Sequence, residues 1–295
     1  MTVALGLVAL GMVTPYLLQR MNGRGPTPIV ITAHLAALVV VWIGIIDIAV
    51  GAAGLSHRLV EFCNLALHDP PVDSDIRRVV MMIVVVVVMI GRAANLWWRT
   101  AHTTRRTRRH LLTTATHSAH DVTFASVGSV ACTVGLLRPR VFVDSIMFPA
   151  LTSSQRDAVL AHERGHVRGY HGVIDLTARC LAAGLAPWPG ARLSQREVRR
   201  HLEAIADDRA ARCTSRRTVA TAIVTAATMP PSPALGAAGW SSWRVDRMLD
   251  PVPRQHRALA AAAIVLILLS VMALVQTIGH LLAGVHLVPM TFPAL

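Results

Sequence analysis

Four long apolar runs separated by polar segments dominate the pattern along the chain, at residues 3–18, 29–55, 79–98 and 258–284. A helix that crosses a bilayer needs about 20 predominantly apolar residues, so the pattern predicts four transmembrane helices. The first run is short, but it lacks the basic segment and the A-x-A site of a signal peptide, so we expect an uncleaved span. Asp47 interrupts the second run and is either a functional group or a residue close to the membrane interface.

The segment between the third and fourth runs, residues 99–257, has about 160 residues and is long enough to bury its own core. We therefore expect a three-span membrane region over 1–98, this domain, a fourth transmembrane helix over 258–284 and a short extracytoplasmic tail over 285–295. The predicted fold class is mainly α, a multi-span membrane protein that carries one α+β domain outside the bilayer.

Strands and helices are both predicted within that domain. β-Type residues at 121–131 and 140–144, broken by Gly135 and Pro139, predict a small sheet or hairpin. Residues 140–144 form either an edge strand that holds an extended peptide or an ordinary core strand. Ser154 and Asp157 resemble a capping box at the start of a helix. Helices are predicted at 155–170, 173–184, 194–212 and 218–228, and the second of these is apolar enough to pack on the membrane or on the first.

The net charge of +13 is carried entirely by arginine, and its distribution bears on orientation and partners. A dense group of arginines follows the third apolar run, and cytoplasmic loops of membrane proteins are enriched in basic residues. We therefore expect a multi-pass protein of the cell membrane with a cytoplasmic domain. No helix-turn-helix or zinc-finger pattern accompanies the arginines, so the expected partner is the anionic lipid surface rather than nucleic acid. The four cysteines are scattered and are expected to be free thiols.

Residues 162–166 read H-E-R-G-H, an H-E-x-x-H pattern in a segment predicted to be helical. Side chains four residues apart lie on one face of a helix, so His162 and His166 can reach the same metal ion. Glu163 lies beside them and can act as a general base. This arrangement is that of a zinc-dependent peptidase, in which zinc activates a water molecule. The alternative is an amphipathic helix with two hydrogen-bonded histidines.

A second acidic pattern follows about 40 residues later, in the helix predicted at 194–212. Glu203 and Asp207 are four residues apart and share a face. A catalytic zinc takes three protein ligands and one open position, so Glu203 is the expected third ligand. Asp207 is then placed to accept the second ring N–H of a ligand histidine. His171 lies one residue before the third-histidine position of the metzincin pattern, and is expected to be a supporting or surface residue.

The order of these features resembles the BlaR/MecR-type integral-membrane zinc metallopeptidases. The resemblance begins with three spans and a basic stretch and closes with a final span. Four motifs lie between them: G-L-L-R-P-R-V-F-V at 135–143, L-A-H-E-R-G-H at 160–166, E-A-I-A-D at 203–207 and R-V-D-R-M-L-D-P at 244–251. It implies a zincin-like metalloprotease domain with Zn²⁺ bound by His162, His166 and Glu203, Glu163 as the base, and Asp207 in the E-x-x-x-D position. The antibiotic sensors of that family carry an extracellular penicillin-binding domain, which we do not expect here, since the chain ends at Leu295.

Three functions remain open at this stage. The first is a regulatory zinc endopeptidase that cleaves a cytoplasmic protein, such as a transcriptional repressor, at a specific site. The second is a quality-control protease of the HtpX type, and the third is a non-catalytic membrane signalling scaffold. The substrate, the activating signal, the residue that stabilises the transition state and the oligomeric state are not indicated by the sequence.

Overall fold

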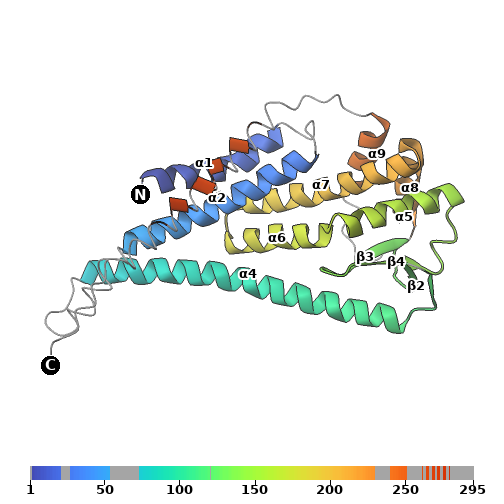
Figure 1. The fold of residues 1–295 in the computed structure, drawn as a ribbon, viewed down its shortest axis with the longest axis horizontal. Coiled ribbons are helices and arrows are strands. Elements are labelled where there is room, and N and C mark those ends of the chain that lie inside the picture. The colour runs from blue at the N-terminus through green and yellow to red at the C-terminus, as the bar shows by residue number, and fades with distance from the viewer. Residues whose placement is uncertain are drawn as a thin grey trace.

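The computed structural model describes residues 2–20, 27–53, 73–119, 121–229 and 240–250, together with scattered residues between 261 and 279. These residues form a mainly helical protein with one small sheet (Figure 1). The helices are α1 Thr2–Arg20, α2 Thr27–Ala53, α4 Asp73–Thr113, α5 Ser153–Arg168, α6 His171–Gly184, α7 Pro189–Cys213, α8 Arg216–Thr228 and α9 Ser241–Leu249. The strands are β1 His117–Ala119, β2 Val122–Ala125, β3 Ala131–Val134 and β4 Arg140–Asp144.

Two helices among the described residues are long and apolar enough to cross a membrane, Pro28–Ala49 in α2 and Val80–Thr113 in α4. The apolar window of α4 is only 6% buried by protein, as expected for a helix whose side chains contact lipid. The first predicted span forms the shorter apolar helix Ala4–Gln19, which packs along α2. The fourth predicted span falls almost entirely outside the described residues. Asp47 is buried in α2.

The apolar helices α1, α2 and α4 run in alternating directions (Figure 1). The end of α1, the start of α2 and the end of α4 all point toward the side of the molecule that carries the sheet and α5 (Figure 1). The basic segment 99–113, which was expected on the cytoplasmic side, therefore lies on the same side as the sheet and α5. The helix α4 is 41 residues, about 60 Å, long in all, and it continues without a break past its apolar part to Thr113.

The sheet has the strand order β1-β2-β4-β3, in which β4 pairs in parallel with β2 and antiparallel with β3. The prediction that residues 140–144 might form an edge strand is wrong. Strand β4 pairs on both edges, and four of its five residues are buried, because its side chains pack into one cluster on each face of the sheet. The edge strand next to α5 is β3, whose four residues are all half-buried.

The start of α5 is fixed by a capping box two residues earlier than expected. Thr152 accepts a hydrogen bond from the backbone N–H of Gln155, and the Gln155 side chain accepts one from the Thr152 backbone. The pair predicted from the sequence, Ser154 and Asp157, does not form the cap. Glutamine completes such a box as well as glutamate does, because its amide oxygen is an equally placed acceptor.

Helices α5 and α7 pack directly against each other, and the contact between them is unusually close at Gly165. A Cβ atom built on Gly165 would lie 3.1 Å from the Cα of Ala206 and 3.3 Å from its Cβ. The missing side chain of Gly165 and the small side chain of Ala206 therefore let the two backbones approach. Because Gly165 lies between Glu163 and His166, and Ala206 lies between Glu203 and Asp207, this contact determines how far apart the candidate metal ligands are.

We predict that Gly165→Val destabilises the protein by about 1–3 kcal/mol, because the added methyl groups push α7 away from α5. Gly91→Val is the matched control, since a Cβ at Gly91 meets no atom within 4 Å. Its free energy of unfolding should stay within about 0.5 kcal/mol of that of the wild type. Denaturant titration of both variants in detergent micelles compares them. Equal stabilities would show that the α5–α7 contact is not tight.

Candidate active site

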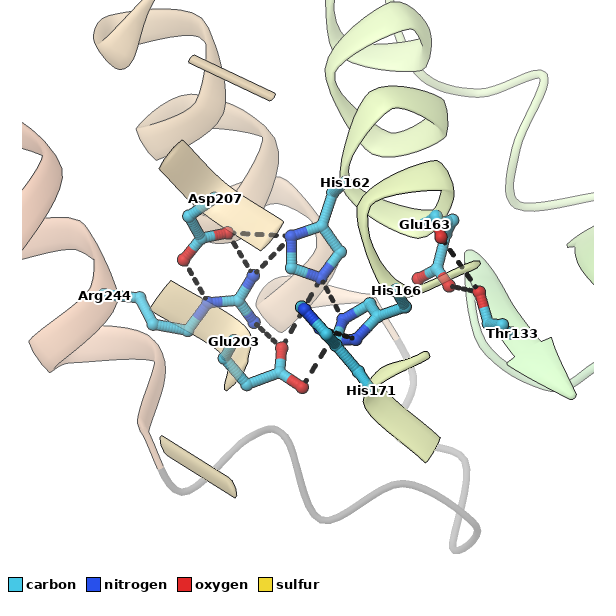
Figure 2. A network of polar contacts seen from close by, with 8 residues as sticks. All are labelled: Thr133, His162, Glu163, His166, His171, Glu203, Asp207 and Arg244. Carbon is cyan, nitrogen blue, oxygen red and sulfur yellow. Dashed lines mark hydrogen bonds and ion pairs between the residues drawn. The ribbon is translucent and has the colours of Figure 1, made fainter. Parts of the chain in front are cut away.

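The three predicted metal ligands meet at the contact between α5 and α7. His162 Nε2 lies 3.0 Å from His166 Nε2 and 3.4 Å from Glu203 Oε2, and His166 Nε2 lies 3.6 Å from Glu203 Oε1. Figure 2 shows the two imidazoles and the Glu203 carboxylate converging on one point. His162, His166 and Glu203 form the group of metal-binding side chains found among the described residues.

These separations fit a zinc ion. Ligand atoms about 2.0–2.1 Å from a tetrahedral zinc are about 3.3–3.4 Å from one another. The three observed separations lie within a few tenths of an ångström of that value. Two imidazoles and one carboxylate are also the ligand set of a catalytic zinc, which leaves a fourth position for water. The residues present therefore fit the metal that the sequence motif implies.

Glu163 projects from the same helix toward the sheet, beside the histidines (Figure 2). Its side chain is only 9% exposed, and its Oε2 accepts a 2.6 Å hydrogen bond from the hydroxyl of Thr133 on β3. The same hydroxyl lies 3.2 Å from the Glu163 backbone oxygen. Burial raises the pKa of Glu163 above its ordinary value, against the opposing effects of His162 and Thr133. A carboxylate with a raised pKa holds a proton more readily, which suits a general base.

Each histidine has a second partner on its other ring nitrogen. His162 Nδ1 lies 2.9 Å from Asp207 Oδ1, the contact expected from the spacing of Glu203 and Asp207. His166 Nδ1 lies 2.9 Å from the Nδ1 of His171, which is buried at the start of α6. Such contacts fix the orientation of a ligand imidazole and direct its free nitrogen at the metal. His171 is therefore a buried supporting residue rather than a surface residue.

Asp207 is itself held by Arg244, a buried residue of α9. Arg244 Nε donates to Asp207 Oδ2 at 2.8 Å, and Nη2 donates to Oδ1 at 2.7 Å. The remaining nitrogen, Nη1, lies 3.3 Å from Glu203 Oε2. The Arg244 guanidinium thus contacts Glu203, a proposed metal ligand, and also Asp207, the residue that supports the ligand His162. A paired, planar contact of this kind fixes both position and angle, which a lysine ammonium cannot do.

The electrostatic environment differs between the two histidines. Burial lowers the pKa of His162, but hydrogen bonds with Asp207 and Glu203 outweigh it and raise the pKa to about 9. Burial lowers the pKa of His166 to about 4 and that of His171 to about 3. Burial tends to raise the pKa of Asp207, but bonds from Arg244 and His162 lower it to about 2. His166 and His171 are therefore neutral at physiological pH, whereas His162 holds a proton that it must lose to bind a metal.

A pocket of about 420 Å³ opens over these residues. Strand β3 and the segment that follows it form one wall, and α5, α7 and α8 form the others. His162, Glu163, His166 and Glu203 all line it, as does Arg244. The pocket is large enough for a few residues of an extended peptide, and apolar surface predominates on its walls.

The profile of peptidase family M48 matches residues 106–277, which is more than half of the chain. The chain belongs to peptidase family M48. This is a metallopeptidase family whose members generally depend on zinc. No curated protein and no solved structure matches the chain. The match begins within α4 of this M48 peptidase and includes every residue of the site.

Two residues of this M48 site were not assigned from the sequence. Thr133 lies on a short strand, and no local pattern links it to Glu163, which is 30 residues away. Arg244 lies in the R-V-D-R-M-L element that carries the family resemblance, but metal-ligand spacing does not select an arginine. His201 is close to Glu203 in sequence but does not take part in the site. It is buried against Trp243, and the centroids of the two rings lie 6.0 Å apart.

We predict that Arg244→Ala destabilises the M48 peptidase by about 3–5 kcal/mol, because it leaves the buried Asp207 carboxylate without its cation. Arg247→Ala is the control on the same helix. Arg247 makes the same two-pronged contact with Asp208 of α7, but both side chains are about one quarter exposed. Its loss should cost about 0–1 kcal/mol. Denaturant titration measures both changes, and similar losses for the two variants would contradict the account.

Proposed function

We propose that this M48 peptidase is a membrane-bound zinc endopeptidase whose zinc is held by His162, His166 and Glu203. When bound in that position, zinc polarises the peptide carbonyl and lowers the pKa of the attacking water. The observation that carries the proposal is the convergence of three ligand atoms at tetrahedral spacing with a buried glutamate beside them. The apolar window of α4 and the M48 match support the membrane setting and the reaction class.

Glu163 is the proposed general base. Its carboxylate accepts the proton of the attacking water and then delivers it to the amine that leaves. The hydroxyl of Thr133 holds one carboxylate oxygen, Oε2, which leaves Oε1 for the water. Since Thr133 lies on β3, the position of the base is coupled to the strand that lines the pocket.

Strand β3 is the proposed binding edge for the substrate backbone. Among the described residues β3 pairs only with β4, and its other edge lies along the pocket that contains the proposed metal ligands. An extended peptide that adds to this edge by main-chain hydrogen bonds is held parallel to the strand. This binding mode would place the scissile carbonyl group of the peptide next to Glu163 and the two histidines.

The proposed physiological role is regulatory cleavage of a cytoplasmic protein, such as a transcriptional repressor. The support is the order of the predicted spans, the placement of the R-V-D-R-M-L element and the resemblance to BlaR/MecR-type peptidases. The proposed topology has four spans, with the termini outside and the peptidase domain cytoplasmic. The basic segment at the end of α4 faces the anionic lipid surface in this arrangement.

We predict that Glu163→Gln abolishes peptide cleavage and keeps zinc, because the amide cannot accept the proton of the water but leaves the ligands intact. His166→Ala and Glu203→Ala should lose zinc as well. Glu197→Ala is the control for Glu203→Ala, since Glu197 lies on the same helix and pairs with Arg200 away from the site. Metal analysis of the purified variants tests the assignment. Full zinc content and full activity in Glu203→Ala would refute it.

The substrate is tested by comparing new protein N-termini in cells that carry the wild type or Glu163→Gln. The proposal predicts that one or a few cytoplasmic cleavage sites disappear in the variant. The loss of many sites across membrane proteins would instead establish a quality-control protease. Identical N-termini in the two strains under envelope stress would show that the protein acts as a scaffold.

A further inference from the structure

Helices α6 and α7 form a hairpin whose turn carries no charged residue. From Cys180 to Ala191 the sequence reads C-L-A-A-G-L-A-P-W-P-G-A. The first charged residues on either side are Arg179 and Arg192. The other end of α6 begins at His171, which contacts the proposed metal ligand His166. The hairpin therefore connects an apolar tip to the floor of the catalytic pocket.

The tip lies against the middle of α2. The indole N–H of Trp42 donates to the backbone oxygen of Leu181 at 2.9 Å. Gly184 packs on the Trp42 ring so closely that no side chain fits between them. Trp42 lies well inside the candidate span Pro28–Ala49, so the tip is not at the end of this span.

The tip also lies against the middle of the apolar part of α4. Met89 shares one buried cluster with Ala182, Leu185 and Ala191. One turn further along α4, Arg92 Nη1 donates to the backbone oxygen of Ala186 at 3.2 Å. Ala186 is in the turn, so this bond satisfies a carbonyl group that no helix pairs. Buried carbonyl groups at membrane depth require such a partner.

The depth of the tip follows from helix geometry. Trp97 and Trp98 are exposed at the end of the apolar run and suit the membrane interface. Met89 is nine residues before Trp98, about 13 Å along the helix, whereas half of the hydrocarbon layer is about 15 Å thick. The tip that contacts Met89 is therefore close to the bilayer midplane if α4 crosses the membrane.

The same geometry locates the catalytic pocket. Gly184 and His171 are thirteen residues apart on α6, about 20 Å along its axis. The His171 end of the hairpin thus lies a few ångströms beyond the hydrocarbon boundary, at the depth of the lipid headgroups. A second cluster agrees with this placement. Ile31, near the start of the α2 span, packs with Val198 and Leu202, and Leu202 directly precedes Glu203.

We propose that the α6–α7 turn is a re-entrant membrane hairpin, inserted into the lipid from the catalytic side, which fixes the peptidase pocket in the headgroup layer. Its partner is the acyl-chain region of the bilayer, which contacts the exposed Pro187 and Pro189 at the tip. Arg179 Nη1 lies 3.9 Å from Asp175 Oδ2, one turn of α6 closer to the pocket, so its charge lies on the headgroup side of the tip.

The hairpin also defines a substrate class, and this step rests on the proposed function. A peptide must reach a pocket at headgroup depth to be cleaved. The substrates are then protein segments that lie on the membrane surface or directly follow a transmembrane helix. A soluble protein such as the proposed repressor belongs to this class only when the segment that is cleaved reaches the membrane surface.

The hairpin is tested by site-directed spin labelling of the full chain, carrying Glu163→Gln and no native cysteine, in lipid bilayers. The probe is Pro189→Cys at the tip, and Ala183→Cys on α6 is a second probe. Ile83→Cys, on the exposed face of α4, is the control for lipid. Ile146→Cys, which is 83% exposed beside the sheet, is the control for water.

The expected result is that both tip probes lose collisions with a water-soluble nickel complex and keep collisions with oxygen, as Ile83→Cys does. Retained zinc in each labelled variant shows that the site still folds. Nickel accessibility at Pro189 and Ala183 equal to that at Ile146, with Ile83 protected, would overturn the hairpin. Because no cleavage is measured, this outcome is separate from any failure of the proposed peptidase activity.

Discussion

The close approach of α5 and α7 at Gly165 and Ala206 is the constraint on which the site depends. The proposed zinc ligands come from two helices, and their atoms must lie about 3.3–3.4 Å apart to share one tetrahedral ion. Side chains of ordinary size at this contact would hold the helices further apart, and the ligands with them. The sequence therefore places its smallest residues between the residues that carry the chemistry.

Charge is the second requirement, because two buried carboxylates and one half-buried carboxylate lie in the site. Glu163, Glu203 and Asp207 lie within it, and Arg244 is the guanidinium that contacts two of them. Arg244 balances one of these charges, and the raised pKa of His162 shows that this imidazole holds a proton beside Asp207 and Glu203 when no metal is bound. A bound divalent cation would replace that proton. Burying such charges without compensation would be costly. The negative charge of the site thus favours a divalent cation at the three proposed ligands.

Local patterns predicted the parts of the structure that local forces determine. The helix with both histidines, the helix with Glu203 and Asp207, and the strand at 140–144 all form as expected. The contacts of Thr133 with Glu163 and of Arg244 with Asp207 could not be derived, because they join segments 30 or more residues apart with no common period. The sheet order could not be derived either, because the parallel pairing of β2 with β4 passes over β3. The proposed membrane depth of the α6–α7 hairpin could not be predicted from the sequence either, because it is inferred from long-range contacts with α2 and α4.

X-ray absorption at the zinc edge of the purified protein tests the central claim most directly. The account predicts one zinc per chain, with two imidazole nitrogens and two or three oxygens at about 2.0–2.2 Å. Replacing Glu203 by alanine should remove the zinc or change its coordination. Any zinc that remains should keep the scattering of two imidazoles and show fewer oxygen ligands. A sulfur ligand at about 2.3 Å, which would implicate a cysteine, or a protein that binds no zinc, would contradict the account.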